Sequence, residues 1–357
     1  MPFTAQELEN ITNSVLEFHM DPGKVYKQTV QNKPLLNAMR SMQKTFPSGK
    51  ENITLRVSGD VTTTIMGYTH DDQVSYQNPA NTKKATFPWK ETHAGLEVTL
   101  TELKEDGISV VDSTTGKSTT EHSGREKTAL ANLLDEKMWD MKEGWDRGEN
   151  TILWRDGTQD SLVPPGIQSF ILTYPTSATV VAGIDQSNVT WWRNRSNGNI
   201  ASGLKSGTGI DVGTPSSLNL ATALQREFRQ LRRYGSPRHM VLCGSDWLDA
   251  MERELRSKGD FTQDGWAKSG KIDMSVADVA FKGVGFEYDP TLDDLGYAKY
   301  AYVIDKSAIY PMVMEGEDMK RHNPARPHDR YVIYKAVTKT FGLVCKMRNT
   351  SGVYWIA

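Results

Sequence analysis

The chain has 357 residues, of which 38% are hydrophobic and 24% are charged, which is the composition of a soluble globular protein long enough for two cores or one large domain with extensions. Its 42 Lys and Arg residues nearly balance 44 Asp and Glu residues, and the net charge of -2 argues against a free-standing nucleic-acid-binding protein. The sequence has no CxxC pattern, so we expect no zinc site of that type. It has no apolar run of about 18 residues and no signal-peptide pattern at its start. We therefore expect no membrane segment, and we expect the protein to be made in the cytoplasm.

The N-terminal quarter contains two short apolar patterns and one alternating pattern. Apolar residues at helical spacing predict an amphipathic helix over residues 4–18, with Thr4 as its cap. A second short apolar set lies within residues 35–42. Apolar and polar residues alternate over residues 53–57, which predicts a strand.

A long hairpin is predicted over residues 67–96, with its turn at residues 78–81. This stretch has β-favouring pieces but few apolar side chains. Because an isolated two-stranded ribbon is marginally stable in water, we expect the hairpin to lie on another subunit. Deletion of residues 72–90 is therefore expected to leave a folded subunit that does not assemble.

A long amphipathic helix is predicted over residues 125–147, ending at Gly148. Its apolar residues are spaced by three and four, so they form one stripe along the helix. The stripe comprises Leu130, Leu133, Leu134, Met138, Met141 and Trp145.

A compact α/β unit is predicted further along the chain. A helix with Thr214 as cap and Pro215 in its first turn is followed by a strand over residues 239–243 and a helix up to Leu255. Further strands are predicted near residues 272–288 and 299–313, and the tail is β-rich.

This order of elements resembles the Hong Kong 97-like fold of tailed-bacteriophage major capsid proteins. Similar stretches are Pro34–Arg40, Gly67–Asp72 continuing through Phe87–Glu91, and Met240–Leu248, and the resemblance covers nearly the whole chain. It implies an α+β fold with an N-terminal arm, an extended β-hairpin loop, a long spine helix, and peripheral and axial domains.

The resemblance also implies a domain organisation. Residues 1–50 would be the N-terminal arm, and residues 51–159 the extended loop and the peripheral domain with its spine helix. Residues 160–315 would be the axial domain, and residues 316–357 would be strands that return to the peripheral domain.

The function implied by the resemblance is that of a major capsid protein. It would self-assemble as pentamers and hexamers into the icosahedral head shell that encloses packaged double-stranded DNA. Expected partners are further copies of the chain, a separate scaffolding protein, a portal, a decoration protein, and DNA bound without sequence specificity. The expected location is the virion capsid, assembled in the host cytoplasm and changed in shape during procapsid maturation.

Two groups of residues are candidates for contacts between subunits. The hairpin candidates are Tyr68, Asp71, Asp72, Tyr76, Lys83, Lys84, Phe87, Trp89 and Lys90. The basic candidates are Arg226, Arg229, Arg232 and Arg233. For the basic group, a solvated helix face, inter-subunit ion pairs and contact with DNA phosphates all remain open. The mixed segment Trp191–Arg195 predicts a buried or interfacial anchor, with base stacking as an alternative.

Catalytic motifs are absent from the sequence: it has no GxSxG, P-loop, HExxH or EF-hand pattern. We therefore expect no enzyme activity, no catalytic residue, no cofactor and no metal site. Two other hypotheses remain open at this stage: a nanocompartment (encapsulin-like) shell with protein cargo, and a soluble enzyme or binding domain with an interaction hairpin.

Overall fold

The structure is a computed structural model. It describes residues 3–4, 31–59, 61, 63–73, 76, 78, 81–105, 110–111, 124–199, 209–234, 238–257, 279–281, 283–322, 324 and 332–357. The chain forms two compact units, each made of three separate segments. Unit 1 comprises Met1–Gln31, Glu91–Glu149 and Met314–Thr340, and unit 2 comprises Asn32–Lys90, Asn150–Val313 and Phe341–Ala357.

Unit 2 contains a six-stranded mixed sheet. Its strands, in spatial order, are β11 (Val279–Phe281), β12 (Val284–Tyr288), β10 (His239–Cys243), β13 (Tyr300–Asp305), β17 (Gly352–Trp355) and β9 (Arg195–Ser196). β10 runs parallel to β12 and antiparallel to β13, and β17 runs antiparallel to β13 and parallel to β9. The continuous apolar run Met240–Cys243 is buried, as expected of a central strand.

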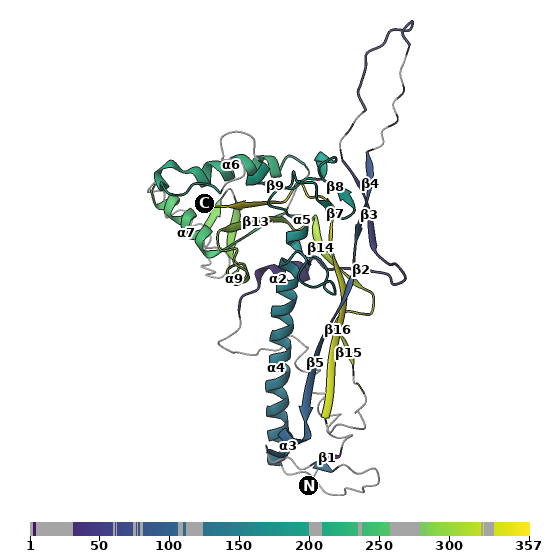
Figure 1. Ribbon diagram of the computed structural model, residues 1–357, viewed down its shortest axis with the longest axis vertical. Helices are drawn as coiled ribbons and strands as arrows, with labels where there is room; N and C mark the ends of the chain where they lie inside the picture. The colour runs from purple at the N-terminus through teal and green to yellow at the C-terminus, as the bar shows by residue number, and fades with distance from the viewer. Residues whose placement is uncertain are drawn as a thin grey trace. The chain divides into compact units, whose positions relative to one another are not determined.

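Helices α6 (Asn219–Leu231) and α7 (Ser245–Ser257) pack against this sheet (Figure 1). The apolar side chains of α6 that are spaced by three and four are buried together with Val241 and Val303 of the sheet; they are Leu220, Leu224, Phe228 and Leu231. The predicted start of α6 was wrong, because Pro215–Ser217 form a separate 3-10 turn. Leu218 follows this turn with a φ of 52°, so the chain changes direction before the α-helix begins.

Unit 2 also contains several smaller elements. They are α2 (Pro34–Ser41), β2 (Lys44–Phe46), β3 (Ile53–Ser58), β4 (Thr82–Phe87), α5 (Ile167–Phe170), β7 (Val180–Val181), β8 (Ile184–Asp185), η1 (Thr190–Trp192), η2 (Asn197–Asn199), η3 (Pro215–Ser217) and α9 (Pro290–Asp294). β14 (Ile309–Met314) pairs with β2 and with the C-terminal part of β16 (Val332–Cys345). The C-terminal strand β17 belongs to the six-stranded sheet of unit 2.

Unit 1 is built around part of α4 (Gly124–Trp154) and the N-terminal part of β16. β5 (Lys90–Thr99) and β15 (Lys320–His322) both pair with β16. Its remaining elements are α3 (Leu100–Glu105), β6 (Val110–Val111) and β1 (Phe3–Thr4).

The N-terminal helix predicted over residues 4–18 lies almost wholly outside the described residues. Thr4, its predicted cap, instead belongs to β1, which pairs in parallel with β6.

The long helix was predicted correctly, but its predicted end at Gly148 was wrong. Glycine inside a helix costs only about 1 kcal/mol relative to alanine, and the residues that follow Gly148 are strongly held. Asn150 accepts a hydrogen bond from the backbone N–H of Leu36, and Trp154 is fully buried in unit 2. These interactions favour continuation of the helix past the glycine.

The hairpin begins at Ile53, fourteen residues before the predicted start at residue 67. β3 and β4 form an antiparallel ribbon with Ile53 opposite Phe87 and Ser58 opposite Thr82, and residues 59–81 form the loop between them (Figure 1). The described turn lies at Thr69–Asp72, where the N–H and hydroxyl of Thr69 both donate to the Asp72 carboxylate at 2.8 Å. The sequence had predicted the turn at residues 78–81 instead, because of the Asn-Pro pair at residues 78–79. β5, expected in the same hairpin, belongs to unit 1.

Candidate assembly surface

The stem of the hairpin is anchored in its own chain. Phe87 is fully buried and packs edge-on against Phe170, with 5.7 Å between ring centroids. Trp89 is half-buried, and its indole N–H donates to the Lys50 carbonyl at 2.8 Å. Phe87 is therefore excluded as a contact residue for another subunit. Lys90, the last hairpin candidate, is half-buried at the start of β5.

Lys83 and Lys84 lie on the paired stem rather than near the hairpin tip. Lys83 is opposite Val57 and Lys84 is opposite Arg56, and both lysines are exposed. The predicted turn at residues 78–81 would have placed both lysines close to the tip of the hairpin, and the observed pairing corrects this.

The described part of the loop exposes both apolar and acidic side chains. Tyr68 and Tyr76 are 65% and 95% exposed, and Asp71 and Asp72 are also exposed. The hydrogen bonds from Thr69 lower the pKa of Asp72, so its carboxylate stays charged at neutral pH. The exposed large apolar side chains of the loop are Val61, Ile65, Met66, Tyr68 and Tyr76. A run of exposed apolar side chains of this size marks a surface that contacts another molecule.

The four basic candidates divide between the helix and the turn that follows it. Arg226 and Arg229 lie on α6, whereas Arg232 and Arg233 lie just beyond its end at Leu231. All four are exposed. Arg232 lies over the ring of Phe228, and Arg233 lies over the ring of the next residue, Tyr234, with 5.4 Å from its guanidinium carbon to the centroid. The four arginines are thus not one continuous helix face.

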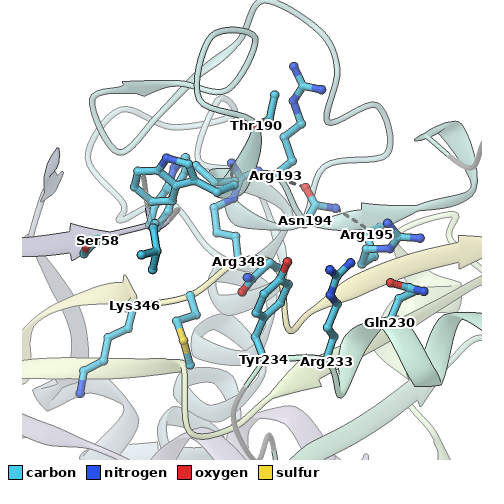
Figure 2. A pocket seen from close by; sticks show the side chains of 16 residues that line it. Ser58, Thr190, Arg193, Asn194, Arg195, Gln230, Arg233, Tyr234, Lys346 and Arg348 are labelled. Atoms are coloured by element: carbon cyan, nitrogen blue, oxygen red, sulfur yellow. Dashed lines mark hydrogen bonds between the residues drawn. The ribbon is translucent and has the colours of Figure 1, made fainter. Parts of the chain in front are cut away.

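Arg233 lines a cavity of about 610 Å³ in unit 2. The wall comes from the base of the hairpin loop, the end of α6 and two further segments, Thr190–Arg195 and Lys346–Asn349. The lining contains no Asp or Glu, whereas its basic side chains are Arg193, Arg195, Arg233, Lys346 and Arg348. Figure 2 shows Arg233 and Tyr234 directed toward Arg348 and Asn194, whereas Lys346 points away from them.

The floor of the cavity is organised by Arg348, which is 1% exposed. Its guanidinium donates to the carbonyls of Phe170 and Trp192 and to the side-chain oxygens of Gln186 and Asn194. Burial lowers the pKa of Arg348 to about 10, which leaves the side chain protonated at neutral pH. A buried positive charge therefore lies under the cavity, held by neutral oxygens.

Two other arginines of the wall are held by their own chain. Arg195 forms a bidentate pair with the fully buried Glu227 at 2.8 and 2.9 Å, and these hydrogen bonds raise the pKa of Arg195. Arg193 donates to the carbonyls of Gln186 and Ser187. Among the residues that the structure describes, no carboxylate lies within ion-pair distance of Arg233 or Lys346.

The tryptophans of the Trp191–Arg195 segment anchor the hairpin loop. Trp192 is buried, and a Cβ atom added at Gly59 would lie 1.9 Å from the ring of Trp191. A side chain is thus excluded at Gly59, where the loop leaves β3. No spacing pattern in the sequence would have connected Gly59, Trp191 and Arg348, because they come together only in the folded chain.

The helix stripe is described only in part. Met138 and Trp145 are buried in unit 1 and Met141 is half-buried, whereas the side chains of Leu130 and Leu134 lie outside the described residues. The indole N–H of Trp145 donates to Glu149, which also pairs with the buried Lys339. This part of the stripe packs within its own chain, so we assign it no contact with another subunit.

Neither a metal site nor a membrane-spanning helix is found in the described parts of the chain. Over these residues, no three His, Cys, Asp or Glu side chains are grouped so that they could bind a metal ion. None of the helices described here is long and apolar enough to cross a lipid bilayer.

The whole fold is similar to capsid structures of phages. The capsid asymmetric unit of cyanophage A-1(L) matches with a TM-score of 0.59 and 13% identity, over 94% of this chain and 97% of that chain. The capsid of a native GTA particle matches with a TM-score of 0.53 and 12% identity, over 95% and 96% of the two chains. The capsid of cyanophage P-SCSP1u matches with a TM-score of 0.52 and 11% identity, over 94% and 91%. No protein-family model and no curated protein matches the sequence. The chain thus has the fold of phage capsid subunits, and the predicted α+β capsid fold is confirmed.

Proposed function

We propose that this chain is a major capsid protein, whose copies assemble into the closed head shell of a bacteriophage around packaged double-stranded DNA. The observation that carries the proposal is the similarity to capsid subunits over nearly the full length of both chains. The exposed apolar side chains of the 59–81 loop support it, because they need a partner surface that the described part of the chain does not provide.

The shell would form through many weak contacts of the same kind. A surface of one copy that binds a different surface of the next copy produces rings when the rotation closes, and pentamers and hexamers are such rings. Because a closed shell repeats each contact in every subunit, modest individual affinities are sufficient.

The partners follow from this role. Arg226, Arg229 and Arg232 would contact neighbouring copies or DNA phosphates, and contact with DNA would be independent of sequence and weakened by salt. A scaffolding protein, a portal and a decoration protein would complete the particle. Assembly would take place in the host cytoplasm and the product would be the virion capsid. We assign no catalytic role to any residue.

Negative-stain electron microscopy of the expressed protein tests the proposal directly. We expect closed shells of uniform size, with or without a co-expressed scaffolding protein. A well-folded, monodisperse monomer at high concentration under both conditions would instead support a soluble enzyme or binding domain. The content of purified shells distinguishes a phage capsid from a nanocompartment, because double-stranded DNA indicates a capsid and protein cargo indicates a nanocompartment.

A further inference from the structure

The cavity beside Arg233 combines features that together specify a ligand. One wall is aromatic, with Trp191 and Tyr234, and the positive charges of Arg233 and Arg348 face the space without a lining carboxylate. The side-chain oxygen of Asn349 is buried without a hydrogen-bond partner in the part of the chain that is described. A ligand that fits this cavity carries a negative charge, an aromatic or apolar group and a hydrogen-bond donor.

The turn of the hairpin loop has these same three features. Asp71 is exposed beside the Thr69–Asp72 turn, which the Asp72 carboxylate closes through its two hydrogen bonds with Thr69. Tyr68 is 65% exposed and lies edge-on to His70, with 6.4 Å between ring centroids. The N–H groups of Thr69 and Asp72 donate within the turn, so the donors that it offers are the N–H groups of His70 and Asp71. The turn is therefore a pre-organised acidic and aromatic surface.

Within one copy, the turn lies at the tip of the hairpin loop and the cavity lies at the base of the loop. Gly59 lines the cavity, and Thr69 follows ten residues later, a span of roughly 33 Å in extended backbone. Figure 1 shows the loop leaving β3 and β4 as a long open ribbon. The turn is thus held away from its own cavity.

We propose that the cavity receives the Thr69–Asp72 turn of a second copy of this chain, with the Asp71 carboxylate paired to Arg233. The incoming Tyr68 lies against Trp191 and Tyr234, and a backbone N–H of the turn donates to Asn349. The proposal rests on the shell function above and names the contact that connects neighbouring subunits. Because each copy offers one turn and one cavity, the contact is head-to-tail, and it produces rings when the rotation between successive copies closes.

A nucleic-acid phosphate would also pair with Arg233, but the structure favours the protein turn. A phosphate would leave Tyr68, Ile65 and Met66 exposed, whereas the turn places its apolar and acidic groups in a cavity with complementary groups. Arg193 and Arg195 are already engaged by their own chain, which limits the cations available to a phosphate backbone.

Disulfide cross-linking tests the contact directly, because the two native cysteines, Cys243 and Cys345, are both buried. The variant Asp71→Cys/Arg233→Cys is oxidised with diamide and separated by non-reducing denaturing electrophoresis. We expect a ladder of multiples of the subunit that ends at the ring size. The control variant Asp71→Cys/Arg253→Cys has its second cysteine at an exposed position of α7 outside the cavity, and it should remain a monomer band. A missing ladder, or equal ladders in both variants, would overturn the proposal.

Charge exchange tests the same contact through assembly. We expect Arg233→Glu or Asp71→Arg alone to lower the yield of shells roughly tenfold or more, because every subunit repeats the lost pair. The combination Arg233→Glu/Asp71→Arg should restore the yield. The control Arg253→Glu makes the same change of charge at an exposed position of α7 and should match the unchanged protein.

The outcomes separate this inference from the proposed function. Normal shells from Arg233→Glu would overturn the inference and leave the shell function intact. If Arg233→Glu forms normal shells that retain less DNA, the cavity binds nucleic acid, and the inference is overturned as well. If the unchanged protein forms no shells, the proposed function fails, and the cross-linked ladder still reports whether turn and cavity meet in smaller oligomers.

Discussion

Buried charged residues join distant segments of unit 2 and hold its surface elements in place. Arg348, near the C-terminus, gathers carbonyl and amide oxygens from residues 170–194, and in doing so it forms the floor of the cavity. Glu254 of α7 is 1% exposed and accepts hydrogen bonds from the backbone N–H groups of Leu220 and Ala221 at 2.9 and 3.0 Å. It therefore caps the N-terminus of α6, where the preceding Leu218 provides no side-chain cap.

Glu254→Gln tests the strength of this cap. The glutamine amide N–H₂ would face a backbone N–H, so one hydrogen bond and the charge-assisted character of the other would be lost. We expect the free energy of unfolding to fall by about 1–3 kcal/mol. The measurement is urea denaturation of the unassembled subunit. Glu252→Gln on the same helix affects a partly exposed i,i+4 pair with Arg256 and should cost less than about 0.5 kcal/mol. Equal losses in the two variants would contradict the capping role.

The hairpin is an element with two different parts. Its stem is part of the core, because Ile53, Ala85 and Phe87 are buried within the chain. The described residues of its loop from 61 to 78 are exposed, so they contribute little to the stability of the isolated subunit. The stem thus serves folding, and the loop is available for assembly.

Replacement of residues 61–80 by a short glycine–serine turn separates these two roles. We expect the free energy of unfolding to change by less than about 0.5 kcal/mol, because the replaced side chains that are described are exposed. Shell formation, followed by electron microscopy and light scattering, should be lost. Normal shells from this variant would show that the loop is not an assembly element.

Deletion of residues 72–90 is the informative comparison. The sequence pattern predicted a folded subunit after this deletion, but the structure contradicts that prediction because the deletion removes β4 and Phe87. Loss of the buried phenylalanine side chain alone costs about 3–5 kcal/mol, so we now expect an unfolded chain.

At the scale of the whole molecule, neither unit corresponds to one continuous stretch of sequence. Each comprises three segments, and the boundaries pass within α4 and within β16. The contiguous boundaries predicted at residues 50, 159 and 315 do not coincide with this division.

Hydrogen exchange compares the subunit before and after assembly. We expect peptides from residues 61–73 to exchange quickly in the unassembled subunit and about tenfold or more slowly in shells, because the loop becomes covered by a neighbour. Peptides from β10 should exchange slowly in both states, since this strand is buried within one chain. Fast exchange of the loop in intact shells would argue against its proposed contact.

The sequence by itself determined the long helix and the α6–β10–α7 succession, whereas the capsid fold was implied by the resemblance of the order of elements to a known family. These elements have strong local patterns: the buried stripe Leu220, Leu224, Phe228 and Leu231 follows the helical period, and β10 is a continuous apolar run. Local periodicity determines which residues must be buried, and this does not depend on the distant partner that buries them.

Only the tertiary structure decided where elements end and which residues form the cavity. Gly148 does not stop α4, because Asn150 and Trp154 make contacts with residues far away in the sequence. Phe87, a candidate contact residue from the sequence, is a core residue because β4 pairs with β3. The cavity is lined by residues that are far apart in the sequence, among them Gly59, Trp191, Arg233 and Arg348. Such contacts depend on packing between distant segments, which leaves no periodic signal in the sequence. The hairpin can thus be predicted from the sequence pattern. The cavity in which we propose that the turn of a second copy binds forms only when distant segments of the chain pack together.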